Sequence, residues 1–141
     1  MVFFRYAVII LSAVAIACLA VSCGESKVVQ CNKLNEIINK ADTVTKGAKT
    51  GNPSALIKAA VELDKVAKTL KAVEVEDKKL QGLRSSFLIM YGDISKSFRN
   101  MAFSIQRQEA QGISSTLIFF KQARKKDTAL VKEINSYCAG K

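Results

Sequence analysis

Residues 80–105 read LQGLRSSFLIMYGDISKSFRNMAFSI, and this stretch decides the fold. Its large apolar side chains recur at steps of three and four residues, which is the repeat of one face of an α-helix. They are Leu80, Leu83, Phe87, Tyr91, Ile94, Phe98, Met101 and Ile105. The spacing predicts a long helix that packs this stripe into a core. Periodicity favours core packing over an aromatic ligand pocket, because packing alone explains the pattern.

The same repeat predicts two helices before this one. The apolar face of the first comprises Cys31, Leu34, Ile38 and Ala41. It fades at the two glycines of residues 46–51. The second helix opens at Asn52–Pro53, since Asn is a preferred N-cap and Pro fits the first helical turn. Its seam comprises Leu56, Ala60, Leu63, Val66 or Ala67, Leu70 and Val73. Asp77 is then the expected N-cap of the long helix.

A fourth helix is expected after a polar connection at residues 106–112. It should begin near Ser114 or Ser115. Its stripe comprises Leu117, Phe120, Ala123 or Arg124, Thr128, Val131, Ile134 and Cys138. No segment shows the alternation of a strand. Four amphipathic helices with short connections predict an all-α, up-down-up-down antiparallel four-helix bundle.

The chain begins with an apolar segment that indicates its compartment. Residues 6–22 (YAVIILSAVAIACLAVS) carry no charge, follow Arg5 and end in small residues before Cys23. A short basic start, an apolar run and a small-residue region are the layout of a secretory signal peptide. We therefore expect a signal peptide at residues 1–22, a lead-in at 23–30 and a bundle domain at 31–141. The domain would face the periplasm or an equivalent lumen.

The end of this segment, LAVSC at residues 19–23 followed by GES, resembles the lipobox of bacterial lipoprotein precursors. It departs from the usual pattern, because Ala20 stands where Leu is common. The resemblance implies that Cys23 is lipidated on sulfur and becomes the N-terminal residue, which anchors the chain to the membrane. Two alternatives stay open. Cys18 is a second lipidation candidate, and residues 6–22, at the lower length limit for a membrane span, could form an uncleaved transmembrane helix.

The overall plan is also similar to that of small four-helix lipoproteins of cyanobacteria. The segments CNKLNEIIN (31–39) and EINSYC (133–138) carry this resemblance. Extrinsic photosystem lipoproteins of that group are likewise lipidated four-helix bundles, but they have a proline-rich lead and lack the two bracketing cysteines. The resemblance implies a structural or interaction role by analogy of fold.

Two cysteines fall in the expected bundle domain, Cys31 near its start and Cys138 near its end. Cys18 and Cys23 belong to the N-terminal segment, so two cysteines remain in the domain. In an oxidising compartment, such a pair predicts one disulfide. The topology gives a second argument. In an up-down-up-down bundle, the start of the first helix and the end of the fourth lie at the same end, so the two cysteines are brought together.

The chain is strongly basic, with 22 Lys and Arg against 12 Asp and Glu and a net charge of +10. Removal of residues 1–22 deletes only Arg5 and leaves 21 basic and 12 acidic side chains, a net charge of +9. Such a charge favours an acidic protein or an anionic lipid surface. Nucleic acid is not an expected partner of an exported domain. The densest basic run is Lys121, Arg124, Lys125 and Lys126, a candidate docking patch for which a solvated helix face is the simpler interpretation.

The sequence offers little for catalysis. It has no histidine, the commonest acid–base group and metal ligand at neutral pH. It also has no nucleophile motif, phosphate loop or CxxC spacing. Glu74, Glu76 and Asp77 crowd one junction, which we interpret as a solvated turn with a helix cap. We therefore expect no catalytic residue, no metal and no cofactor.

Two functions fit these observations. The first is a membrane-anchored, exported lipoprotein with a non-catalytic structural or protein-interaction role. The alternative is a binding module for an apolar ligand, such as a lipid or pigment, lined by the aromatic residues of the long helix. A cavity of several hundred Å³ would favour the ligand-binding module, and a filled core the interaction protein.

Overall fold

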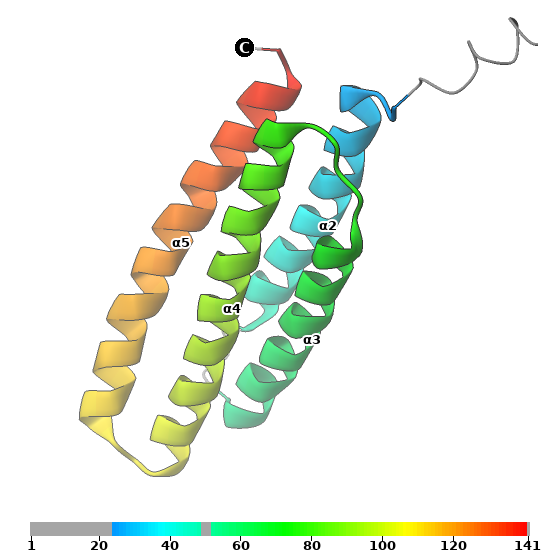
Figure 1. Ribbon diagram of the computed structural model, residues 1–141. Helices are drawn as coiled ribbons and strands as arrows, with labels where there is room; N and C mark the ends of the chain where they lie inside the picture. The colour runs from blue at the N-terminus through cyan, green and yellow to red at the C-terminus, as the bar shows by residue number, and fades with distance from the viewer. Residues whose placement is uncertain (1–23, 49–51, 141) are drawn as a thin grey trace, which may run out of the picture.

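The computed structural model describes residues 24–48 and 52–140. They contain α2 (Lys27–Gly47), α3 (Pro53–Ala72), α4 (Lys78–Gln106) and α5 (Ala110–Cys138). The helices lie side by side and alternate in direction (Figure 1), which confirms the predicted all-α four-helix bundle. The expected signal segment, with Cys18, and the lipidation site Cys23 lie outside the described residues.

The two ends of the bundle differ. One end holds the start of α2, the α3–α4 connection and the end of α5 (Figure 1), and we call it the tether end. The opposite end holds the connection between α4 and α5, and we call it the far end. The described chain enters the bundle at the tether end, at Gly24.

Helix α4 is the centre of the packing. It packs extensively against α3 and α5, whereas α2 packs mainly on α3 and touches α5 little. Seven of the eight residues in its predicted stripe are buried, and Ile105 is half-buried. The Phe87 and Tyr91 rings lie 5.8 Å apart, and Phe98 packs on Phe120 of α5 at 5.4 Å. Full burial of a large apolar side chain stabilises a fold by about 1.5–3 kcal/mol, so this stripe provides the main stabilisation of the bundle.

The predicted helix starts at Asn52 and Asp77 are confirmed. The Asn52 side chain accepts hydrogen bonds from the amides of Ser54 (2.9 Å) and Ala55 (3.2 Å). The Asp77 carboxylate accepts one from the Leu80 amide at 2.9 Å. Such caps satisfy amides that have no partner within the helix.

The first helix begins earlier than we expected. Ser26 is its N-cap and accepts a hydrogen bond from the Val29 amide at 3.4 Å, so α2 starts at Lys27. Residues 27–30 of the expected lead-in are therefore helical. The segment from Cys23 to the first helical residue is correspondingly shorter.

The connection from α4 to α5 is also shorter than residues 106–112, because α5 begins at Ala110 and not near Ser114 or Ser115. Gln108 adopts a left-handed conformation (φ 56°), which reverses the chain within three residues. Gly112 lies inside α5. A Cβ atom there would sit 2.4 Å from the Ser104 Oγ atom, so this glycine permits close approach of the two helices and does not mark a turn.

Helix α5 is much less buried than its predicted stripe suggested. Only Ala123 and Ile134 are fully buried. Leu117 is 44% exposed, and Thr128 is also exposed. The cause is that α5 packs on α4 while α2 hardly covers its other flank.

Candidate interaction surface

A disulfide fixes the end of α5 at the tether end. The sulfur atoms of Cys31 and Cys138 are 2.06 Å apart, and their Cα atoms are separated by 5.9 Å. Cys31 is buried and Cys138 is half-buried. The bond therefore joins the first helix to the last beside the point where the chain enters the bundle.

Gln30 joins the entering chain to the α3–α4 connection. This side chain is buried, although its position was expected to belong to the lead-in. Its amide group donates to the Glu25 carbonyl oxygen at 2.6 Å. Its oxygen accepts from the backbone amides of Glu76 (2.9 Å) and Asp77 (3.1 Å). The tether end is thus held by specific hydrogen bonds as well as by the disulfide.

Asp77 contributes a second link at this end, between α4 and α5. Besides capping α4, its carboxylate accepts a hydrogen bond from the Tyr137 hydroxyl at 2.8 Å. The Leu80 amide and this hydroxyl hold the pKa of Asp77 below its usual value, and the same bond raises the pKa of Tyr137. The Lys27 Nζ atom lies over the Tyr137 ring, 3.6 Å from its centroid. The predicted cap at Asp77 is therefore confirmed, and the hydrogen bond to Tyr137 is a further contact that the sequence did not indicate.

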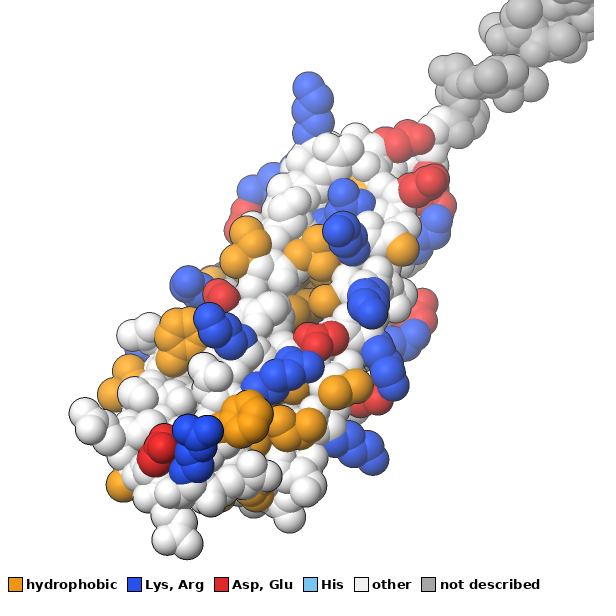
Figure 2. Space-filling model, turned by 60° about the horizontal axis from the view of Figure 1, so that its bottom comes forward, with side chains coloured by type: hydrophobic (Ala, Val, Ile, Leu, Met, Phe, Trp, Pro, Cys, Tyr) orange, Lys and Arg blue, Asp and Glu red, His pale blue; other side chains and the backbone are white. Residues whose placement is uncertain are grey.

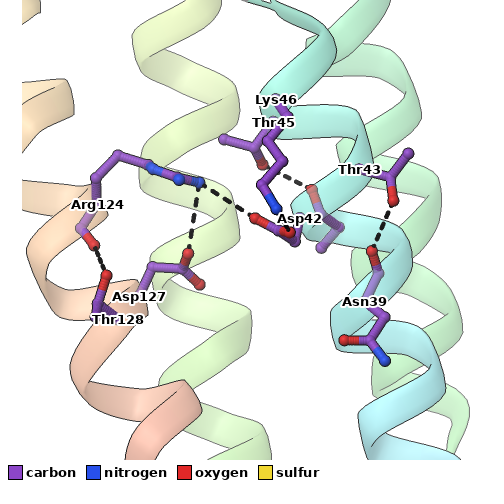
Figure 3. A network of polar contacts seen from close by, with 9 residues as sticks. Asn39, Asp42, Thr43, Thr45, Lys46, Arg124, Asp127 and Thr128 are labelled. Carbon is purple, nitrogen blue, oxygen red and sulfur yellow. Dashed lines mark hydrogen bonds and ion pairs between the residues drawn. The ribbon is translucent and has the colours of Figure 1, made fainter.

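A polar cluster joins α2 to α5 at mid-height (Figure 3). The Arg124 guanidinium lies 3.6 Å from Asp42 of α2 and 3.6 Å from Asp127 of its own helix. Lys46 forms a second ion pair with Asp42 at 2.5 Å. Contacts between α2 and α5 are few, and these charges add a link at mid-height to the Cys31–Cys138 disulfide at the tether end.

The pKa values of the two carboxylates in this cluster are shifted in opposite directions. Hydrogen bonding to Lys46, with the charge of Arg124, holds the pKa of Asp42 below its usual value. Burial raises the pKa of Asp127. Beneath them, the Tyr91 hydroxyl is buried without a hydrogen-bond partner among the described residues, and burial raises its pKa well above the usual value. The ion pairs of this arrangement connect α2 to α5.

The candidate basic patch is only partly assembled. Lys121, Lys125 and Lys126 are exposed on α5, as a docking patch requires. Arg124 is not part of that exposed face, because its side chain turns toward Asp42 and Asp127 (Figure 3). The sequence stripe left Ala123 and Arg124 as alternatives for the core-facing position, and Ala123 is the buried one.

Large apolar side chains are exposed on the outer side of α4 and α5. The most exposed are Ile89 (69%), Ile118 (60%), Phe103 (53%) and Phe119 (48%). Figure 2, turned toward the far end, shows hydrophobic side chains at the surface among lysines and arginines. Phe119 is not part of the predicted stripe of the fourth helix, and it lies at the surface between α4 and α5.

A groove runs between α4 and α5 and consists of two hollows of about 340 Å³ each. Phe119 and Lys96 line the hollow nearer the far end. Ile89 and Lys126 line the other, and Asp93 borders both. We call this feature the α4–α5 groove.

A smaller cavity lies inside the far end of the bundle. It has a volume of about 160 Å³ and is lined by side chains of all four helices, among them Leu56, Phe98 and Phe120. Ligand sites for drug-sized molecules measure about 300–1,000 Å³. This cavity is therefore too small to enclose a lipid or a pigment.

No protein-family model, curated protein or solved structure matches this chain. In residues 24–48 and 52–140, no group of three or more His, Cys, Asp and Glu side chains is arranged to hold a metal ion. In the same described parts of the chain, no helix is both long and apolar enough to cross a membrane.

Proposed function

We propose that this chain is a membrane-anchored, exported lipoprotein with a non-catalytic, protein-interaction role. The anchor is the lipid on Cys23, which the lipobox-like end of the apolar segment supports. The alternative anchor is the same segment as an uncleaved transmembrane helix. Either anchor holds the bundle by its tether end.

One observation carries the interaction role: α5 buries only two of its 29 residues, whereas α4, of equal length, buries twelve. Phe119 and Ile118 remain exposed on the outer side of α5. Each Å² of apolar surface removed from water contributes about 25 cal/mol, so covering these side chains would stabilise a complex with a partner. Exposed apolar side chains that gather on one face of a domain are typical of an interaction site.

The position of this surface agrees with an anchored interaction protein. Phe119 precedes Cys138 by 19 residues of continuous helix, which corresponds to about 29 Å along the axis. The disulfide and the entering chain lie at the tether end. Phe119 and its neighbour Ile118 therefore lie well away from the anchored end, where a partner in the lumen can reach them.

The ligand-binding alternative has less support. The cavity of about 160 Å³ inside the far end falls short of the several hundred Å³ that an apolar cofactor needs. We therefore rank an internal lipid or pigment site below the interaction role.

Site-specific crosslinking in the native membrane tests the proposal. A photo-crosslinking amino acid replaces Phe119 on α5 or, as the control, Lys68, an exposed residue of α3. We expect a crosslinked protein at position 119 and none at position 68. Cys23→Ala should block removal of the apolar segment, which leaves a larger chain in the membrane fraction. A chain that fractionates without membranes before any substitution, or crosslinks equally at both positions, contradicts the proposal.

A further inference from the structure

The α4–α5 groove has the length and shape of a seat for a helix. Its two hollows share Asp93 and follow one another along the outer side of α4 and α5. From Ile89 to Asn100, which line its two ends, α4 advances about 16 Å, or three helical turns. A groove between two neighbouring helices is the surface into which a third amphipathic helix lays its apolar face.

The groove also offers apolar contacts at both ends. Ile89, with Met90 and Leu130 beside it, lines the hollow nearer the tether end. Phe119 lines the hollow nearer the far end. A bound helix would contact them with apolar residues on one of its faces, as in helix-in-groove recognition.

The charge around the groove defines the partner's chemistry. Lys96 and Lys126 line it, and Asp93 is the one acidic residue among the lining residues of the two hollows. Three further exposed lysines lie on α5: Lys121, Lys125 and Lys132. Within residues 24–48 and 52–140, none of these five lysines lies within ion-pair distance of a carboxylate, so they are available to an acidic partner.

Two other occupants fit less well. A second copy of this chain would bring the lysines of one α5 against those of the other, and like charges in an interface are costly. An anionic bilayer would satisfy the lysines. Phe119 and Ile89, however, line the groove, and the flat surface of a bilayer does not enter a groove as a helix does.

We propose that the α4–α5 groove binds an acidic amphipathic helix of a partner protein. This inference rests on the proposed interaction role and names the chemistry of the partner. The apolar face of that helix contacts Ile89 and Phe119, and its acidic flanks pair with Lys96 and Lys126.

A peptide-binding experiment tests the inference. The probe is a fluorescent helical peptide with leucines three and four residues apart and glutamates on its flanks, and the control probe has glutamines in place of the glutamates. The mature protein in detergent carries Phe119→Ser or Lys126→Glu. The matched controls are Phe103→Ser and Lys58→Glu, which alter exposed residues outside the groove. All four side chains are exposed, and thermal unfolding verifies that each variant folds.

We expect the glutamate peptide to bind at least about tenfold tighter than the glutamine peptide, and each groove variant to weaken it about tenfold. The control variants should leave binding unchanged. Equal losses in groove and control variants would show diffuse attraction to a basic protein and overturn the inference. Binding to phosphatidylglycerol vesicles without binding to the peptide would overturn it in favour of a lipid surface.

The crosslinking result at position 119 separates this inference from the proposed function. If position 119 crosslinks a protein in the native membrane but the peptide does not bind, the interaction role stands and the acidic-helix partner is rejected. If neither occurs, both are rejected.

Discussion

Replacement of both Cys31 and Cys138 by Ser should destabilise the bundle by up to about 5 kcal/mol. The disulfide links residues 107 positions apart. For a loop of that length, the chain-entropy treatment gives about 5 kcal/mol, which is an upper value for real proteins. Ordinary domains are stable by roughly 5–15 kcal/mol, so the bond contributes a large share of the total.

The loss should fall mainly on the last turns of α5. Apart from Ile134, the half of α5 that approaches the tether end has no fully buried residue. Its other links there include the Tyr137–Asp77 hydrogen bond and the Lys79–Glu133 ion pair, both partly exposed. Exposed ion pairs contribute roughly 0–1 kcal/mol, too little to replace the covalent bond.

Urea unfolding measures the loss, and hydrogen exchange locates it. With a urea dependence of roughly 1.5–2 kcal/mol/M, a loss of 4–5 kcal/mol lowers the midpoint by roughly 2–3 M. Amides of residues 130–138 should lose protection before those of α3 and α4. The control is the wild-type chain with its disulfide reduced and alkylated, which should match the double variant. An unchanged midpoint, or loss of protection spread evenly over all helices, would refute this reasoning.

Three further substitutions test the packing and the charges. Gly92→Ala should raise the free energy of unfolding by about 1 kcal/mol, because the added Cβ meets nothing within 4 Å and Gly is a poor helix former; a lower melting temperature would contradict this. Gly112→Ala should lower it by about 1 kcal/mol through contact with the Ser104 Oγ atom, and Ser104→Ala, which removes that atom, should restore part of the loss when thermal unfolding of both is compared. Asp127→Asn should stabilise the chain at neutral pH. The raised pKa of Asp127 means that the folded state binds its proton more tightly than the unfolded state, so its contribution to stability falls as pH rises from the ordinary Asp value through the folded pKa. The gain should vanish below about pH 4, and urea midpoints from acid to neutral pH that show a less stable variant throughout would exclude this account.

The architecture could be predicted because the apolar residues repeat so regularly. The stripe from Leu80 to Ile105 indicates which face of α4 is buried, and seven of its eight residues are in the core. The caps at Asn52 and Asp77 were also recognisable, since both residue types satisfy free amides at a helix start. These features depend on local sequence, so a single sequence is enough to predict them.

The environment of α5 could not be predicted in the same way. Periodicity identifies its apolar face, but it does not show how closely a neighbouring helix approaches that face. Leu117 therefore belongs to the stripe and is still 44% exposed. Arg124 pairs with Asp42, which is 82 positions away in the sequence, and no local signal indicates that partner. Gln30 was missed for a similar reason, because its partners Glu76 and Asp77 lie on a distant connection.

Intact-mass measurement of the protein extracted from membranes tests the central claim most directly, because that claim is a lipoprotein anchored through Cys23. We expect a chain that begins at Cys23 and carries a diacylglycerol group with a further acyl chain, since two or more chains give stable anchoring. Cys23→Ala should leave the apolar segment attached. A mature chain that begins elsewhere without lipid, or that retains Met1, would contradict the account.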